Sequence, residues 1–290
     1  MSRSATTPSR ARVSTLLSKV PEITVMFWVA KLLTTGMGET TWDALDIAFQ
    51  QTIAVAITGV LFVASMIIQF ARRSYNAWAY WFAVVMVSVF GTTVADLVHN
   101  DFGVPYTVST SVLLVLVAVV FALWYRVEGT LSIHSITTRR REAFYWAAVL
   151  LTFALGTAAG DWTASTLHLG YLPSGIIFGV LFLLPAIAYR WFGMNAIAAF
   201  WTSYILTRPF GASFADYFGG PGGRGGLALG MDRVSIVLTA VIVAVVAYFA
   251  ISKVDRPRDG EADVAAADGA AVEGAAVDGV PADRSGTTTR

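Results

Sequence analysis

The sequence contains no cysteine, and only 13% of its 290 residues carry a charged side chain. Without cysteine there is no disulfide framework and no thiolate to act as a nucleophile or metal ligand. The charged fraction is about half that of an ordinary soluble domain. A formal net charge of +1 also leaves no overall basic surface for nucleic acid. The composition therefore excludes a disulfide scaffold, a thiol enzyme and a basic nucleic-acid-binding protein.

Apolar residues are abundant instead, at 56% of the chain. They gather into stretches long enough to cross a bilayer core of about 30 Å as helices, without the alternation of a membrane barrel. The eight stretches are 22–45, 51–71, 77–98, 106–126, 143–167, 172–190, 194–217 and 234–252. The sequence thus predicts an all-α polytopic membrane bundle of eight transmembrane helices at residues 21–253, with the lipid bilayer as its main partner.

The basic residues predict the orientation. If both termini are cytoplasmic, 16 of the 20 Lys and Arg residues lie on the cytoplasmic side, and only Arg224 and Arg233 lie outside. This asymmetry favours a bacterial inner-membrane protein with both ends inside. Residues 1–20 are expected to form a polar, basic tail, and residues 254–290 a disordered acidic tail that cannot bury a core.

A fourfold repeat is the most specific signal. Each copy has an aromatic residue before a Trp, a Gly ten residues after that Trp, and an Asp five residues later. The copies are Phe27-Trp28, Gly38, Asp43; Tyr80-Trp81, Gly91, Asp96; Tyr145-Trp146, Gly156, Asp161; and Phe200-Trp201, Gly211, Asp216. The repeats, about 21–73, 74–126, 139–190 and 194–253, each contain two spans and are therefore parallel. Their marked helices either line one shared centre or pair two by two.

Each part of the motif has an expected role. The aromatic pair falls where Trp and Tyr anchor helices at the headgroup boundary. The Gly lies about 15 Å deeper and permits close helix packing or a local break, as between Thr34 and Gly38. Pro209, two residues before the fourth Gly, is expected to kink its helix. The Asp lies about 22 Å from the Trp, in the outer half of the membrane.

Ionisable residues inside predicted spans are costly and suggest function. We expect the acids to bind a cation or protons; they are Glu39, Asp43, Asp96, Asp161 and Asp216. Lys31 and Arg208 are the candidate counter-charges. Lys31 alternatively extends to the inner interface, and Arg208 alternatively forms a fixed ion pair or binds an anion. The structural alternative for the acids is capping of the outer helix ends.

Two histidines lie near the predicted outer helix ends. His99 is three residues after Asp96, and His168 is seven after Asp161, so each shares a helical face with its acid. Asp and His together suit a divalent metal, although histidines at a wet interface are the simpler interpretation. No ATP-binding motif occurs, and we expect no cofactor.

The first unit also carries a resemblance. Residues 19–24 (KVPEIT), Phe27-Trp28, Lys31 and residues 34–40 (TTGMGET), with the Gly-x4-Asp core elsewhere, are similar to a bacterial family of multi-pass proteins. The hairpins of that family are catalogued as a repeat of unknown function, among uncharacterised membrane-anchored proteins. The resemblance spans about residues 18–252. It implies the repeated architecture and the inner-membrane location, and it implies no activity.

The leading functional hypothesis is a secondary transporter or exporter of a small cation, divalent in one version, coupled to protons through the intramembrane carboxylates. A cation channel with a ring of Asp residues is one alternative. A non-transporting sensor or scaffold is another. An intramembrane enzyme is not expected, because Gly160-Asp161 lacks the flanking pattern of aspartyl proteases and no serine or zinc protease motif occurs.

Overall fold

The computed structural model describes residues 19–256, so the tails predicted at 1–20 and 254–290 lie outside the described residues except for 19–20 and 254–256. Within 19–256 the chain is helical, and no strand is present. The long helices, in chain order, are α2 (Val25–Ala48), α3 (Gln51–Ala71), α4 (Ala77–Asp96), α5 (Tyr106–Glu128), α6 (Arg139–Asp161), α7 (Tyr171–Phe192), α8 (Ala196–Gly219) and α9 (Met231–Ser252). They coincide with the eight predicted stretches to within a few residues. The all-α prediction is therefore confirmed.

The first helix of each repeat begins at a polar cap. The capping side chain accepts a hydrogen bond from a backbone N–H two or three residues on, which satisfies a donor that the first helical turn leaves free. The four caps are Thr24, Asn76, Thr138 and Asn195. The second helix of each repeat begins without such a cap. The caps therefore set where α2, α4, α6 and α8 start.

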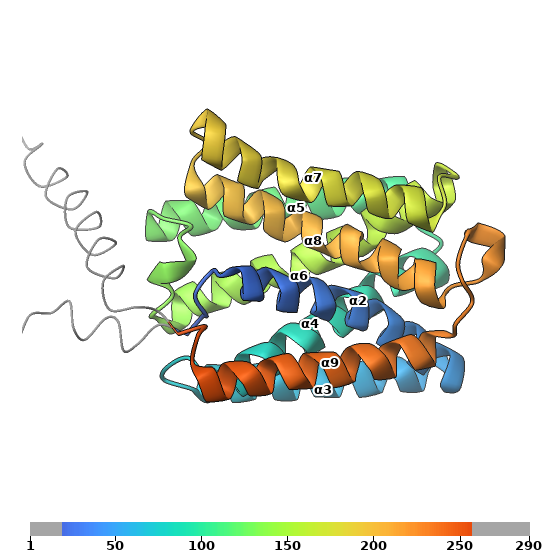
Figure 1. The fold of residues 1–290 in the computed structure, drawn as a ribbon, viewed down its shortest axis with the longest axis horizontal. Helices are drawn as coiled ribbons and strands as arrows, with labels where there is room; N and C mark the ends of the chain where they lie inside the picture. The colour runs from blue at the N-terminus through green and yellow to red at the C-terminus, as the bar shows by residue number, and fades with distance from the viewer. Residues whose placement is uncertain (1–18, 257–290) are drawn as a thin grey trace, which may run out of the picture.

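These four capped helices, which we call the inner helices, form a closed ring. Helix α2 packs on α4, α4 on α6, α6 on α8, and α8 returns to α2. They run in the same direction through the middle of the bundle (Figure 1). Of the two arrangements that the repeat allowed, the structure therefore has the one with a shared centre.

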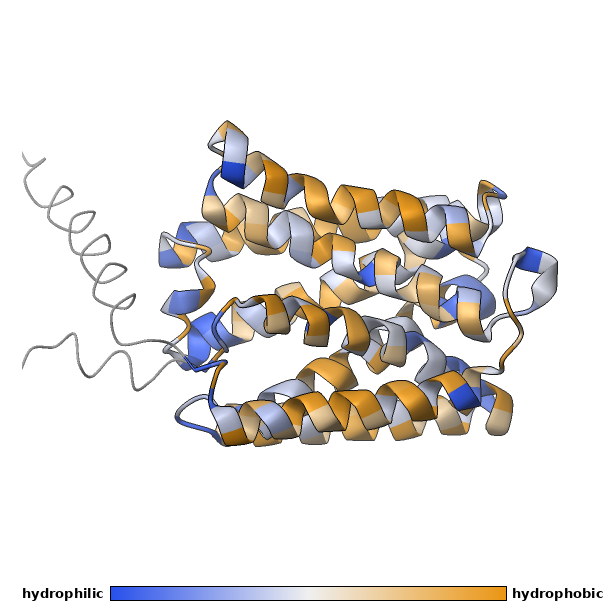
Figure 2. Ribbon diagram, in the orientation of Figure 1, coloured by the Kyte–Doolittle hydropathy of each residue, from blue (hydrophilic) through white to orange (hydrophobic). Residues whose placement is uncertain are grey.

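The outer helices α3, α5, α7 and α9 surround this ring in a regular order. Each packs mainly on the inner helix of the following repeat: α3 on α4, α5 on α6, α7 on α8, and α9 on α2. Their outward faces are apolar and exposed, with Val60 at 68% and Ile236 at 68% (Figure 2). An apolar surface of this extent on a helical bundle matches lipid rather than water.

Six helices are long and apolar enough to cross a membrane: α3, α4, α5, α6, α7 and α9. Helix α3, for example, has 21 residues and a length of about 31 Å. The other two, α2 and α8, are the inner helices that carry the buried pair Glu39 and Arg208. The chain is thus a membrane-type helical bundle in which charge lies inside and apolar surface outside.

One end of the bundle, called the closed end below, is sealed by the segments beside the described termini. The Lys19 ammonium donates to the Glu142 carboxylate at 2.5 Å, and the Gln69 amide donates to the same carboxylate at 3.0 Å. The Tyr75 hydroxyl donates to Asp255. Burial raises the pKa of the Asp255 carboxyl above its ordinary value. Because Lys19 and Asp255 are both buried, the packed bundle extends beyond the predicted limits of 21 and 253.

Candidate functional site

The motif glycines are the contact points of the ring. Each faces the residue three positions before the glycine of the next repeat, so closely that an added Cβ would overlap with it. The contacts are Gly38 with Ser88, Gly91 with Phe153, Gly156 with Arg208, and Gly211 with Thr35. The last contact joins the fourth repeat to the first. The glycines therefore hold the inner helices together, and no helix breaks at them.

Helix α2 is continuous where a local break was one of the two expectations, and α8 continues through Pro209, where a kink was expected. Helix α2 runs unbroken from Val25 to Ala48, through the Thr34–Gly38 segment. Pro209 lies inside α8 without ending it, and its ring packs beside Gly156. Close packing from both sides holds these segments in the helical state, which outweighs their weak local helix preference.

Repeat-equivalent side chains form four layers along the inner helices, at three, seven, eleven and fifteen residues after the motif Trp. The lysine layer is Lys31, Val84, Val149 and Tyr204; the arginine layer is Thr35, Ser88, Phe153 and Arg208. The glutamate layer is Glu39, Thr92, Thr157 and Ala212; the aspartate layer is Asp43, Asp96, Asp161 and Asp216. The first three layers are buried throughout. In the aspartate layer only Asp216 is fully buried. The ring is therefore buried towards the closed end, whereas three of the four side chains of the aspartate layer are partly exposed; this end is called the open end below.

An ion pair crosses the ring between α8 and α2. The Arg208 guanidinium donates to the Glu39 carboxylate and to the Thr92 hydroxyl, and it also donates to the Thr35 carbonyl at 2.9 Å. Arg208 and Glu39 are only 1% and 4% exposed. Arg208, one of the two candidate counter-charges, thus pairs with Glu39 of the first repeat. The pair joins three inner helices at one depth.

Lys31 neither pairs with an acid nor extends to the inner interface, the two alternatives predicted for it. Its side chain is 1% exposed, so it does not extend to an interface, and its ammonium has no hydrogen-bond partner in the described chain. The ammonium lies 3.6 Å from the centre of the Phe153 ring and 4.0 Å from that of Tyr204. Aromatic faces attract cations in this geometry. Lys31 is therefore held by rings rather than by an acid.

Three carboxylates lie together beside the Arg208 pair. One carboxylate oxygen each from Glu39, Asp43 and Asp216 lies within 4.8 Å of the other two. No hydrogen bond to the Asp43 or Asp216 side chain is present within residues 19–256, although Asp216 is 7% exposed. With the Arg208 charge included, this group, which we call the carboxylate site, has a formal charge of −2 when all three acids are ionised. This charge matches a divalent cation or two protons.

The other two motif acids differ from this group. Asp96 accepts a hydrogen bond of 2.7 Å from the Trp42 indole, which fixes its position. Asp161 has no hydrogen bond in the described chain and is not one of the three grouped acids. Each lies where its helix widens into a π-helical turn, η1 (Leu97–Asp101) and η3 (Trp162–Thr166). Such turns are rare and are frequent at functional sites.

The motif aromatics are not the predicted anchor belt. Seven of the eight are buried, including Trp81 and Tyr145 at 1% exposure each. They contact one another from repeat to repeat, and the Tyr80 and Tyr145 hydroxyls lie 2.5 Å apart. The prediction was wrong because the outer helices cover these residues from lipid. The aromatics instead fill the ring between the lysine layer and the closed end.

The histidines lie apart from the carboxylate site. The His99 ring stacks on Tyr106 at 3.6 Å between centres, and its Nδ1 lies 2.9 Å from the Val104 carbonyl oxygen. His168 is exposed, with a positive φ of 54°. Among the described residues, the acids and histidines grouped closely enough to share an ion do not include either one. The exposure of His168 fits the simpler interpretation of a histidine at a wet interface.

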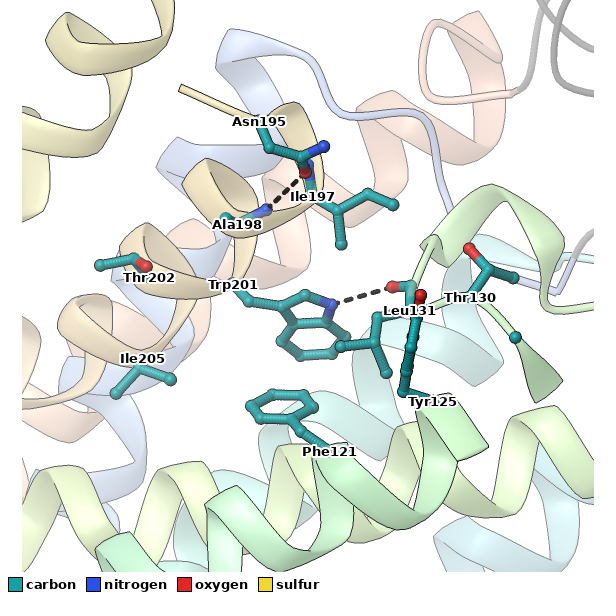
Figure 3. A pocket seen from close by; sticks show the side chains of 11 residues that line it. Phe121, Tyr125, Thr130, Leu131, Asn195, Ile197, Ala198, Trp201, Thr202 and Ile205 are labelled. Atoms are coloured by element: carbon teal, nitrogen blue, oxygen red, sulfur yellow. Dashed lines mark hydrogen bonds between the residues drawn. The ribbon is translucent and has the colours of Figure 1, made fainter. Parts of the chain in front are cut away.

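A cavity of about 530 Å³ opens between α5 and α8 near the closed end (Figure 3). Phe121 and Trp201 form one side, and the Trp201 indole donates to the Leu131 carbonyl at 2.9 Å. No charged residue lines it. The cavity therefore offers apolar surface but no ligand for a cation.

The chain belongs to the family built from the Repeat of Unknown Function DUF347. The family model matches residues 79–130, 144–194 and 199–255, which together exceed half of the chain. The unmatched first repeat is the one that supplies Lys31, Glu39 and Trp42, while α2 still occupies the fourth place in the ring. No curated protein and no solved structure matches the sequence. The family thus supports the repeat architecture, and the chemistry rests on the residues.

Sequence reasoning missed the partners of the charged groups. Phe153 and Tyr204 hold Lys31, and Trp42 holds Asp96. Superposing the four repeats as layers would have placed Phe153 and Arg208 at equivalent positions one layer beyond Lys31. The ring order of the repeats, which decides which layers touch, is a property of the fold.

Proposed function

We propose that this protein is a secondary transporter that exchanges a small divalent cation for protons across a bacterial inner membrane. In this account α2 and α8 cross the membrane with the six apolar helices, and both termini are cytoplasmic. The closed end then faces the cytoplasm and the open end faces outward. The observation that carries the proposal is the carboxylate site, where three acids meet inside an apolar bundle.

The donor set favours a hard cation. Carboxylate oxygens suit Mn²⁺, Mg²⁺ or Ca²⁺, whereas the grouped residues include no His for a softer metal. A bound divalent ion neutralises the formal −2 charge of the site, and protons on Asp43 and Asp216 do the same after the ion leaves. Either state avoids uncompensated charge in the bundle, which is costly.

The filled axis favours a carrier over an open channel. Arg208, Lys31 and the buried aromatic cluster occupy the ring between the carboxylate site and the closed end. A continuous aqueous path would require these side chains to move. Exchange by alternating access, in which the repeats rearrange around a fixed site, needs no such path.

The test uses purified protein in liposomes, with a trapped Mn²⁺-quenched dye and a pH dye. We expect Mn²⁺ uptake to drive proton movement in the opposite direction. Asp43→Asn and Asp216→Asn should each reduce Mn²⁺ flux at least tenfold. Asp46→Asn, an exposed acid one turn further along α2, is the matched control and should keep the wild-type rate. Wild-type flux in both site variants would refute the assignment.

A further inference from the structure

We propose that Phe153 and Tyr204 form a second cation site on the axis, the aromatic box, and that the Lys31 ammonium is its built-in occupant. The ligand class is a small primary ammonium. In the transporter proposed above, on which this role rests, Lys31 closes the axis below the carboxylate site. The box itself is a binding site whether or not the protein transports.

The geometry carries this assignment. The Lys31 ammonium lies 3.6 and 4.0 Å from the two ring centres and has no hydrogen-bond partner in the described chain. The Phe153 ring also lies 5.8 Å from the Arg208 guanidinium carbon. Two cations therefore lie near the Phe153 ring, while only Arg208 has an acid partner.

A desolvated ammonium without an anion is costly, and the two rings are the groups that offset part of this cost. At the equivalent positions of the second and third repeats the chain has Val84 and Val149, each at 0% exposure. An apolar side chain therefore fills this layer in two repeats, and packing alone does not require lysine. The charge of Lys31 is the feature that needs a function.

The box predicts chemical rescue. In detergent, Lys31→Ala should lower the Tm, and methylammonium chloride should restore at least half of the loss because its ammonium enters the vacated box. Sodium chloride at the same concentration should not. Val149→Ala, which removes buried volume from the same layer without charge, should show no rescue. An equal rise in the Tm of both variants with methylammonium, or no rise in Lys31→Ala, would refute the aromatic box as a cation site.

A double-mutant cycle covers the case in which Lys31→Ala does not fold. Lys31→Met keeps the length of the side chain and removes its charge. Phe153→Leu should then lower the Tm more in the wild-type background than in combination with Lys31→Met, because the cation–π contact with Lys31 is lost only in the wild-type background. An equal loss in both backgrounds would show that Phe153 contributes packing only.

The role in transport has a separate readout. In liposomes Lys31→Ala should let Mn²⁺ pass with less counter-movement of protons per ion than the wild type. Rescue by methylammonium in a protein that moves no cation would retain the box and refute the proposed transport. If the wild type transports Mn²⁺ and Lys31→Ala moves as many protons per ion, then Lys31 does not close the axis, while the aromatic box and the proposed transport both stand.

Discussion

Replacing Arg208 with methionine measures how much the buried ion pair with Glu39 contributes to the free energy of unfolding. The substitution keeps much of the apolar volume but leaves the Glu39 carboxylate, 4% exposed, without its cation. It also removes the bond to the Thr35 carbonyl. Removing one partner of a buried ion pair costs about 3–5 kcal/mol, because the remaining charge is uncompensated. We therefore expect Arg208→Met to reduce the free energy of unfolding by that amount.

The double variant Arg208→Met/Glu39→Gln tests the reason for this loss. Replacing both charges by neutral groups removes the orphaned carboxylate, so the two changes should cost less together than the sum of the single losses. The expected coupling is about 2–3 kcal/mol. Unfolding titrations in mixed detergent micelles measure all three variants against the wild type.

The matched control is an Arg–Glu pair whose acid has a second cation. Arg140 donates to Glu128 with 68% of the Arg140 side chain exposed, and Glu128, 5% exposed, also accepts from Arg141, so the loss of Arg140 leaves no orphaned carboxylate and the coupling should be about 1 kcal/mol or less. Arg140→Met/Glu128→Gln should therefore be nearly additive. Additivity of the Arg208 and Glu39 changes to within about 0.5 kcal/mol would refute the buried, mutually dependent pair.

Two further predictions concern packing and pH. Gly91→Ala places a Cβ 2.8 Å from the Phe153 Cβ and should lower the free energy of unfolding by about 1–3 kcal/mol. The control Gly223→Ala, with open space around it, should leave the stability unchanged. Equal Tm values of the two variants would contradict the ring contacts. Burial raises the pKa of Asp255, so the folded state holds its proton more tightly than the unfolded state. Stability from this group should fall as the pH rises from about 4 through the raised pKa, and Asp255→Asn, which retains an acceptor for Tyr75, should remove that slope of Tm against pH.

Much of the bundle follows from the sequence because its signals are local and repeated. The hydropathy of each stretch predicts its helix, and the Trp-to-Asp spacing predicts which helices are equivalent. The motif Gly was correctly expected to permit close packing. The partner of each glycine was not predicted, because the contact of Gly156 with Arg208 depends on which repeats lie side by side in the ring.

The failures have one physical origin. Headgroup anchoring was assigned to Trp81 and its equivalents from their depth along the helix, but the burial of a side chain depends on its neighbours. The outer helices cover these aromatics, so depth alone gave the wrong environment. Lys31 was likewise assigned an acid or an interface, and the aromatic partners Phe153 and Tyr204 come from two other repeats. Such contacts require the ring to be known.

The most direct test of the account is equilibrium binding of Mn²⁺ to the purified protein, followed by the loss of the free-ion electron paramagnetic resonance signal. The account predicts one site per chain, weakened as the pH falls because protons compete for the same carboxylates. Asp216→Asn should abolish this binding, and Asp46→Asn should retain it. Binding that Asp216→Asn leaves unchanged, or no Mn²⁺ bound by the wild type at any pH, would contradict a cation site at Glu39, Asp43 and Asp216.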